Sequence, residues 1–439
     1  MVTKSGSAIW IYMNGAKVGR LSRSSTGKLE LAYAETWLTS ENRRPLSLSL
    51  PLGVTPITGD KVHNFFDNLL PDSTSIRRRI QARVRASSTD SFDILWHIGR
   101  DCVGAMQLLQ KEFDQLDVRG IEGKEVSEAE MADILANYKT MPLGMGEEEA
   151  FRISLAGAQE KTAFLRFDEK WHQPLRMTPS SHIFKLPMGK NSQMDLTDSV
   201  ENEWLCHLLL KEFSVPTANS YIWRFGETKA LVVDRFDRKL SSDRSWIIRI
   251  PQEDVCQALG IAPALKYEKD GGPGIVQVMD LLRGSQYRSE DSRVFMKCQF
   301  IFWLLAAIDG HGKNFSIFLE QEGRFRLTPI YDVISVHPVM REGGLPPRRA
   351  KMAMVQRGKK PHYAWERIKY RHWLNMAKLC GYPQDAMEGI ISEVLETMDQ
   401  AIERTSQQVA GEVVERVAGE IFAGIRTSRE MLAKGKDEV

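Results

Sequence analysis

This sequence has few cysteines and a small net charge. The cysteines argue against two classes of protein, and the charge identifies no partner. The five cysteines form no CxxC pair and have no histidine at metal-ligand spacing; they are Cys102, Cys206, Cys256, Cys298 and Cys380. Neither a disulfide framework nor a zinc site is therefore expected, and reduced thiols, several of them in the core, are predicted. The net charge of +2 is too small to indicate a nucleic-acid partner by itself.

Apolar runs long enough to cross a bilayer are also missing. The longest run, residues 300–308, is too short for this, and residues 1–5 contain no apolar signal region. We therefore expect a cytoplasmic protein without a membrane partner. The composition, 42% hydrophobic and 26% charged, is typical of a globular protein. The length of 439 residues is more than one hydrophobic core usually serves, so two or three lobes are expected.

The chain is predicted to open with antiparallel sheet. Residues 9–13 and 17–21 read as strands around Asn14-Gly15, a strong signal for a tight hairpin turn. The alternate leucines of residues 46–52 predict a further half-buried strand. Residues 62–70 and 73–86 are predicted to be helical.

A second region follows a Gly- and Glu-rich link at residues 142–149. Before the link, Ser127 and Glu130 have the spacing of a capping box, which predicts a helix to about Tyr138. After it, residues 151–167 read as strand, small-residue loop and strand. A further strand around Lys185 and an amphipathic helix over residues 199–213 come next.

The most informative stretch runs from Ala306 to Phe318, because Asp309 and Asn314 have the spacing of the Asp and Asn in a kinase catalytic loop. Phosphoryl transfer requires a carboxylate that orients the attacking hydroxyl, and an amide oxygen nearby that binds Mg²⁺. Residues 327–333 read as a short strand ending near Asp332, which suits the second metal ligand. Each aspartate alone is more often a turn or capping residue, but the ordered set favours a kinase.

A small-residue hairpin over residues 153–161 is the candidate phosphate loop, although such a hairpin taken alone usually binds nothing. It is not a Walker A loop, which would lead into a helix. Lys185 lies in an apolar strand soon after, where a lysine is costly unless its ammonium reaches an anion. The helix that follows offers Glu201 and Glu203 as ion-pair partners of Lys185, and Glu203 is preferred.

With these parts in this order, the sequence resembles the HipA family of serine/threonine toxin kinases over nearly its whole length. The motifs that carry the resemblance are residues 45–51, 64–72, 152–161, 249–254 and 271–274, together with Asp309-Gly310-His311 and Asn314. The resemblance implies an α+β fold with a bilobal protein-kinase-like (phosphatidylinositol-kinase-like) body, a small β-rich N-terminal subdomain and a mainly helical C-terminal lobe. The expected domains are an N-terminal subdomain at 1–110, a helical connector at 111–147, a kinase N-lobe at 148–236 and a C-lobe at 237–439.

The resemblance also assigns site residues for ATP and Mg²⁺. It makes Asp309 the catalytic base and gives the metal to Asn314 and Asp332. The ATP-binding residues that it implies are Ala156, Gly157, Ala158, Gln159, Glu160, Lys161, Lys185, Asp234, Arg235, Phe236, His311, Tyr331 and Asp332. Ser154 takes the position of the family's autophosphorylated serine, where a phosphate of about −1.5 to −2 charge would repel ATP and eject the loop.

Function and partners follow from the same resemblance. Such a toxin causes growth arrest and persistence by phosphorylating an aminoacyl-tRNA synthetase, with glutamyl-tRNA synthetase as the favoured target. A HipB-like helix-turn-helix antitoxin is implied, as is operator DNA bound by the complex in corepression. Lys378 is a weak candidate for direct DNA contact, because Gly381 stands where a family member has an arginine one turn on.

Two other functions compete with the toxin kinase. A small-molecule kinase of the aminoglycoside or choline type shares the Asp and Asn chemistry but leaves about the first 145 residues unexplained. A non-catalytic corepressor is the alternative from another class, although every proposed catalytic position carries a chemically competent residue.

Overall fold

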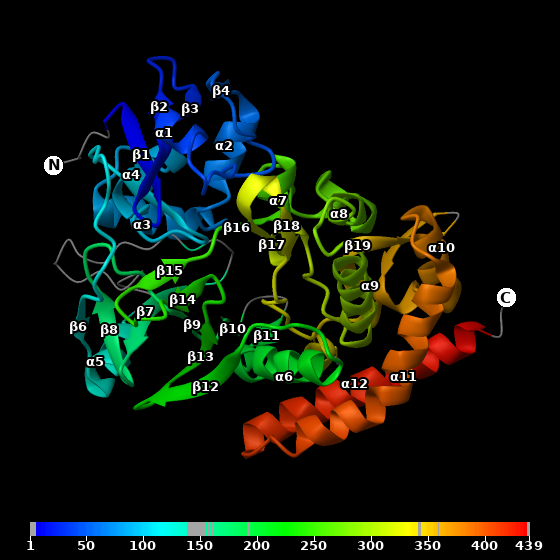
Figure 1. Cartoon of the computed structure of the whole chain (residues 1–439). Coiled ribbons are helices and arrows are strands. Elements are labelled where there is room, and N and C mark those ends of the chain that lie inside the picture. The colour runs from blue at the N-terminus through cyan, green and yellow to red at the C-terminus, as the bar shows by residue number, and fades with distance from the viewer. Residues whose placement is uncertain are drawn as a thin grey trace. The chain divides into compact units, whose positions relative to one another are not determined.

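The computed structural model describes residues 6–137, 155, 159, 161–190, 194–340, 344–358 and 360–436, and it mixes helices and strands as the predicted fold class requires (Figure 1). The chain divides into two compact units, each made of several segments. Unit 1 comprises Met1–Leu186, Trp223–Ala264 and Ile317–Phe325. Unit 2 comprises Pro187–Ile222, Leu265–Ser316 and Arg326–Val439.

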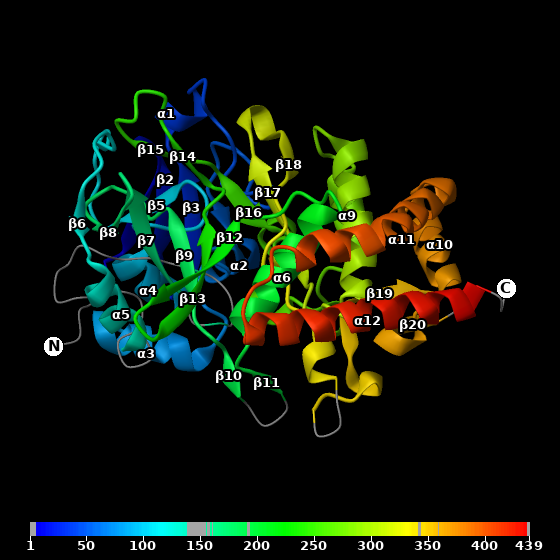
Figure 2. The same cartoon turned by 90° about the horizontal axis from the view of Figure 1, so that it is seen from below.

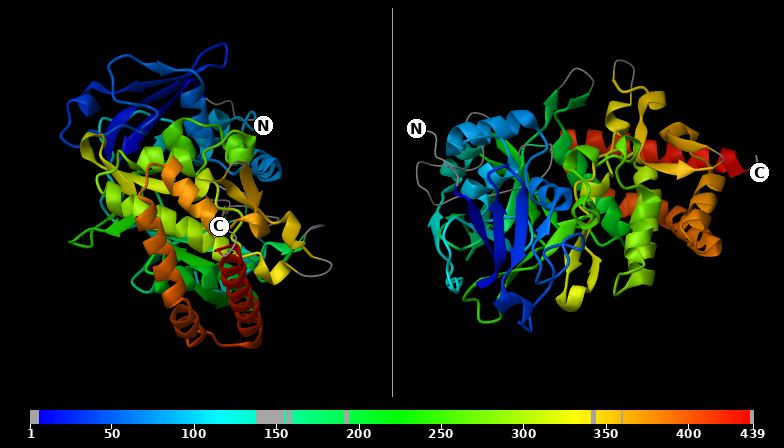
Figure 3. Two further views of the ribbon diagram at one scale, coloured as in Figure 1. Left: turned by 90° about the vertical axis from the view of Figure 1, so that its right-hand side faces the viewer. Right: turned by 90° about the horizontal axis from the view of Figure 1, so that it is seen from above.

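A five-stranded sheet of order β4-β3-β2-β1-β5 opens unit 1. Its strands are β1 (Ala8–Met13), β2 (Ala16–Arg23), β3 (Leu29–Tyr33), β4 (Ile57–Thr58) and β5 (Met106–Leu109). The predicted hairpin is confirmed, because Met13 pairs with Ala16 and both turn residues have positive φ, 47° at Asn14 and 89° at Gly15. The blue strands of this sheet lie side by side in the right-hand view of Figure 3.

Four helices accompany this sheet, namely α1 (Glu35–Leu38), α2 (Asp60–Asp67), α3 (Thr74–Val84) and α4 (Ser91–Ile98). They bury an apolar core with the sheet that includes Ile11, Leu21, Phe66 and Phe92. The helices predicted at 62–70 and 73–86 correspond to α2 and α3.

The strand predicted for residues 46–52 is wrong. The segment forms a turn with a single isolated bridge between Ser47 and Leu50. Its polar groups bond elsewhere in unit 1: the hydroxyls of Ser47 and Ser49 donate to the carbonyl of Gln257 at 3.1 and 2.7 Å. The leucine alternation reflects a buried turn held by side chains, because the polar positions between the leucines are buried as well.

A six-stranded sheet of order β12-β13-β9-β7-β8-β6 follows. Its strands are β6 (Gly123–Glu125), β7 (Lys161–Phe167), β8 (Lys170–Pro174), β9 (His182–Lys185), β12 (Ser220–Phe225) and β13 (Thr228–Asp234). The capping box is confirmed at the start of α5 (Glu128–Ala136). Residues 123–125, within the predicted connector, therefore contribute an edge strand to this sheet.

Shorter elements complete this part of the fold. β14 (Arg238–Leu240) pairs with β15 (Ile247–Arg249), and α7 (Val255–Leu259) follows β16 (Gln252–Asp254). β16 forms a three-stranded sheet with β17 (Ser316–Leu319) and β18 (Phe325–Leu327). The strand predicted over residues 327–333 is therefore misplaced, because β18 ends at Leu327 and only an isolated bridge at Ile330 follows.

Unit 2 is mainly helical. Its helices are α6 (Ser199–Glu212), α8 (Ile275–Leu282), α9 (Arg288–Leu304), α10 (Tyr370–Leu379), α11 (Gln384–Ser406) and α12 (Glu412–Lys436). The long helices α11 and α12 run side by side and both contact α6 (Figure 2). Two hairpins are also present: β10 (Gly189–Lys190) with β11 (Asp195–Leu196), and β19 (Lys351–Arg357) with β20 (Pro361–Ala364).

Short 3₁₀ turns link several elements of the chain. They are η1 (Pro263–Leu265), η2 (Glu268–Asp270), η3 (Gly312–Asn314), η4 (Gln321–Gly323), η5 (His337–Val339), η6 (Pro347–Arg349) and η7 (Trp365–Arg367). All five cysteines are buried and free, as predicted. Within the described ranges, no helix is both long and apolar enough to cross a membrane.

Candidate active site

Asp309 lies in an exposed turn that follows the buried end of α9. The last turn of this helix is fully buried, and Ala306, with a φ of 46°, ends it in the left-handed region. A left-handed residue directly after a helix redirects the chain and satisfies carbonyls of the last turn. The chain thus leaves the apolar core within three residues and brings the carboxylate of Asp309 to the surface of unit 2.

Asn314 connects the predicted catalytic loop to the segment of Asp332. Its Nδ2 donates to the main-chain oxygen of Asp309 at 2.8 Å and to that of Asp332 at 3.4 Å. Because the nitrogen faces these two carbonyls, the side-chain oxygen Oδ1 is directed away from them and can bind a cation. The structure therefore brings together all three residues of the predicted catalytic and metal set.

The segment of Asp332 has an unusual backbone and a firm anchor. Asp332 has a φ of 60°, a left-handed conformation that is uncommon for residues other than glycine and clusters at functional sites. Three residues later, Ser335 exchanges two 2.8 Å hydrogen bonds with the Asn202 side chain of α6. The Ser335 hydroxyl also donates to the carbonyl of Leu305 at 2.6 Å. The segment of Asp332 is thus held by both α6 and the end of α9.

His311 and Tyr331, the predicted nucleotide neighbours, both lie against the catalytic loop. The backbone N–H of His311 donates to the Asp309 carbonyl at 2.8 Å, and its side chain is buried. The Tyr331 hydroxyl donates to the Lys313 carbonyl at 2.9 Å and lies 2.6 Å from the Ser316 hydroxyl. These contacts fix the shape of the loop between Asp309 and Asn314.

Tyr267 is a site residue that the sequence did not reveal. Its hydroxyl donates to Oδ1 of Asp309 at 2.6 Å, and its ring meets the His311 ring edge to face, with centroids 5.0 Å apart. Forty-two residues separate it from Asp309, so no local pattern connects the two. The available signal was its place just before the glycine motif of residues 271–274.

In unit 1, described residues of the predicted phosphate loop lie beside Lys185. Lys161 and Lys185 are directly opposite each other on β7 and β9, and the Gln159 amide donates to the Leu186 carbonyl at 2.9 Å. This register places the two lysines side by side, and their binding of phosphate stays a prediction. Ser154, Ala156, Gly157, Ala158 and Glu160 lie outside the described residues.

The Arg235 guanidinium belongs to a buried ion cluster in unit 1. The cluster members are Asp101, Arg235, Asp237, Arg238 and Arg249, all with side chains at most 7% exposed. The neighbouring arginines hold the pKa of Asp101 well below its usual range despite its burial. The Arg235 side chain is thus committed to this cluster, and its backbone N–H donates to the Ser181 carbonyl at 2.9 Å, so the predicted contact of Arg235 with ATP stays a prediction.

The residues on either side of Arg235 are less enclosed. Asp234 pairs with His182 across β13 and β9, with 3.2 Å between Oδ1 and Nε2. Phe236 packs edge to face on Phe318, with ring centroids 5.7 Å apart. Their predicted place next to adenine stays a prediction.

The predicted ion pair of Lys185 and Glu203 has one member in each unit. Both side chains are buried, Lys185 in β9 and Glu203 in α6. Within α6, Glu203 Oε1 lies 3.7 Å from Nε2 of His207, one turn further along. Glu201, the alternative partner, is buried on the same helix. The pairing stays a prediction, as does DNA contact by Lys378, which is exposed in the last turn of α10.

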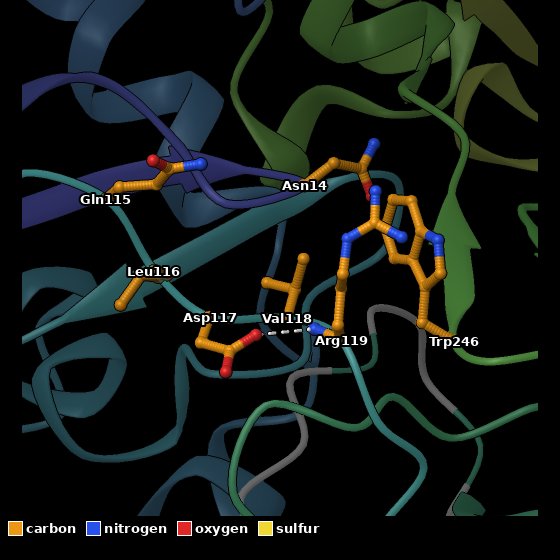
Figure 4. Close-up of a pocket in the computed structure, with 7 residues that line it drawn as sticks. All are labelled: Asn14, Gln115, Leu116, Asp117, Val118, Arg119 and Trp246. Atoms are coloured by element: carbon orange, nitrogen blue, oxygen red, sulfur yellow. Dashed lines mark hydrogen bonds between the residues drawn. The ribbon is translucent and has the colours of Figure 1, made fainter.

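A surface cavity of about 390 Å³ in unit 1 contains none of the predicted site residues. Its lining consists of Asn14, Gln115, Leu116, Asp117, Val118, Arg119 and Trp246 (Figure 4). The Arg119 guanidinium carbon lies 5.8 Å from the centre of the Trp246 ring. Both side-chain polar atoms of Asn14 bond the Arg249 backbone, at 2.8 and 2.9 Å. Asn14 therefore acts as a structural link here.

The donor set in unit 2 fits Mg²⁺. This ion prefers oxygen ligands and typically takes one or two from the protein, the remainder coming from phosphates and water. The side-chain oxygen of Asn314 and the carboxylate of Asp332 would supply the protein ligands. No cluster of three or more His, Cys, Asp or Glu side chains suited to a metal occurs in the part of the chain that the structure describes.

Comparison with known proteins shows which family the chain resembles. Residues 9–109 match the HipA N-terminal domain, and residues 153–402 match the HipA-like C-terminal domain. A protein of Sinorhizobium fredii named "Putative kinase Y4mE" is 29% identical over 97% of this chain and 98% of its own length. The serine/threonine-protein kinase toxin HipA of Shewanella oneidensis is 27% identical over 76% of this chain and 77% of its own.

A solved structure supports the same fold. HipA in the complex of Shewanella oneidensis HipA, HipB and operator DNA superposes with a TM-score of 0.80 at 22% identity, covering 98% of this chain and 99% of that one. The HipA-like C-terminal domain alone spans more than half of the residues. The chain therefore belongs to the HipA family of serine/threonine kinases.

Proposed function

We propose that this kinase transfers the γ-phosphate of ATP to serine or threonine of a protein substrate through Asp309. The observation that carries the proposal is the Asn314 amide, which bonds the main chain of both Asp309 and Asp332 and so joins the proposed base to the proposed metal ligand. Phosphoryl transfer depends mainly on positioning and charge stabilisation, and this arrangement provides both.

Each residue has a defined task in this mechanism. The exposed Asp309 carboxylate accepts a hydrogen bond from the substrate hydroxyl, orients it and takes its proton as the bond to phosphorus forms. Asn314 and Asp332 would hold Mg²⁺, which when bound neutralises charge on the phosphates. The facing lysines Lys161 and Lys185 of unit 1 are proposed to bind phosphate oxygens.

The biological role that we propose is that of the toxin in a HipBA-like toxin–antitoxin module. Its support is the family membership and the fold shared with HipA of a HipA–HipB–operator DNA complex. The proposed partners are a HipB-like antitoxin, operator DNA through that antitoxin, and an aminoacyl-tRNA synthetase as substrate, with glutamyl-tRNA synthetase favoured. The proposed location is the cytoplasm, and the proposed outcome is growth arrest.

Self-modification tests the proposal most directly. Purified protein incubated with ATP and Mg²⁺ alone should gain one phosphate, located at Ser154 by mass spectrometry. Asp309→Gln should abolish this transfer while ATP binding persists, since loss of a base and positioning group costs orders of magnitude in rate but little ground-state affinity. ATP turnover only with added small alcohols would indicate a small-molecule kinase, and absence of ATP binding would indicate a corepressor.

A further inference from the structure

Among the described residues, only Tyr267 hydrogen-bonds the carboxylate of Asp309 with its side chain. The phenol donates to Oδ1 at 2.6 Å, a short distance typical of a hydroxyl bonded to a charged oxygen. Asp309 itself is exposed, so surrounding side chains constrain its rotamer little. The Tyr267 hydroxyl is the contact that selects the direction in which this carboxylate points.

The turn that carries Tyr267 is tied to the catalytic loop by its backbone and its ring. The N–H of Gly312 donates to the Lys266 carbonyl at 3.2 Å, and the Tyr267 ring packs edge to face on His311. The N–H of Gly272 closes the turn onto the Tyr267 carbonyl at 3.0 Å. A Cβ at Gly272 would lie 1.8 Å from the Leu265 carbonyl oxygen, so this close turn requires glycine.

Glu268 anchors the same turn on its other side. Its side chain is only 7% exposed, and its carboxylate accepts from the Val355 N–H at 2.7 Å and from Arg357 at 2.8 Å. A Cβ at Gly274 would lie 2.2 Å from the carboxyl carbon of Glu268, so glycine leaves the space that this carboxylate occupies. The turn is thus held to β19 and to the catalytic loop at once.

We propose that Tyr267 is a positioning residue for Asp309, an inference that rests on the proposed kinase function. The phenol occupies Oδ1, which leaves Oδ2 to accept the hydrogen bond from the substrate hydroxyl. If the Tyr267 hydroxyl only occupied the position of the substrate hydroxyl, it would have to move away from Asp309 in each turnover. Tyr267 is instead part of a turn anchored from two sides, which suits a contact kept throughout the reaction.

Substitution Tyr267→Phe in the full chain tests this role, because it removes the hydroxyl and keeps the ring that packs on His311. Self-phosphorylation is measured in single turnover over a range of Mg·ATP concentrations. We expect the maximal rate constant to fall about tenfold to a hundredfold, the range for losing a hydrogen bond to a charged group. The ATP concentration at half-maximal rate and the melting temperature should stay at their wild-type values. A purely structural role would not lower the maximal rate while leaving these two quantities unchanged.

The matched control is Tyr287→Phe, which removes the hydroxyl of a tyrosine that is 47% exposed at the start of α9 in the same unit. It should match wild type in every measurement. A second variant, Glu268→Gln, weakens the anchor of the turn and should lower the maximal rate by a smaller factor, again without a change in ATP dependence.

Several results would overturn the inference. An unchanged rate in Tyr267→Phe would show that Asp309 needs no such contact, and a faster rate would show that Tyr267 obstructs the substrate. Phosphate located on Tyr267 itself by mass spectrometry would make it an acceptor. These failures differ from failure of the proposed function, in which the wild-type protein itself transfers no phosphate.

Discussion

Glu253 should make the stability of unit 1 depend on pH in a direction opposite to that of an ordinary carboxylate. This side chain is 1% exposed, its Oε1 accepts from the Leu48 N–H at 2.9 Å, and its Oε2 has no hydrogen-bond partner among the described residues. Burial raises the pKa of Glu253 from 4.5 to about 8. The folded chain therefore keeps a proton at pH 7 that the unfolded chain releases.

The sign and size of the effect follow from proton linkage. Between about pH 4.5 and 8 the native state binds more protons at this site than the unfolded state, so the free energy of unfolding falls as pH rises through this window. One pKa unit is worth about 1.4 kcal/mol, so the loss from this group is roughly 2–3 kcal/mol between pH 5 and 7. Above pH 8 both states are ionised, and the contribution no longer changes.

Glu253→Gln tests this reasoning because glutamine resembles the protonated acid and cannot ionise. Urea unfolding followed by fluorescence at pH 5, 7 and 8 should give a variant close to wild type at pH 5 and more stable by roughly 2–3 kcal/mol at pH 7. Glu227→Gln, at an exposed position in the turn between β12 and β13, is the control and should show no such growing difference. A Glu253→Gln stability difference that stays constant from pH 5 to 8 would refute a protonated native carboxyl.

Two further substitutions test the metal site and the buried ion cluster. Asp332→Ala should weaken nucleotide binding in the presence of Mg²⁺ but not in its absence, measured by calorimetry under both conditions; equal losses in the two would argue against a metal ligand. Asp101→Asn should destabilise unit 1 by about 3–5 kcal/mol, because it leaves buried arginines short of a countercharge. The folded pKa of Asp101 is depressed, so its stabilisation is complete at pH 7 and is lost only as pH falls below the unfolded pKa of about 3.8. Asp101→Asn unfolding curves that coincide with those of the wild type at pH 7 would contradict this reasoning.

The sequence by itself determined the local features of this protein. The five-residue spacing of Asp309 and Asn314, the Asn14-Gly15 hairpin and the capping box at Ser127 are each written within a few residues. Turn chemistry and capping depend on neighbours in the chain, so patterns of residue type suffice to find them. The kinase chemistry could be predicted for the same reason, because the proposed base and one proposed metal ligand lie on one loop.

The alternation of apolar residues predicted strands wrongly at two places, where turns or contacts with distant segments replace the pairing of a sheet. The leucines of residues 46–52 imitate a strand, but the serines between them bond Gln257 about two hundred residues later. The segment before Asp332 reads as a strand, yet the chain leaves the sheet at Leu327. In both places a long-range hydrogen bond or a turn replaces the ladder that the alternation suggested.

Only the tertiary structure decided how the site is supported. It placed the Arg235 side chain in a buried ion cluster with Asp101, and it brought the phenol of Tyr267 to the carboxylate of Asp309. It also directed the Asn314 amide onto the carbonyls of Asp309 and Asp332, the second of which lies eighteen residues further along the chain than Asn314. Such contacts join groups that no local interaction couples, and their free energy depends on the burial and orientation that the folded chain alone creates.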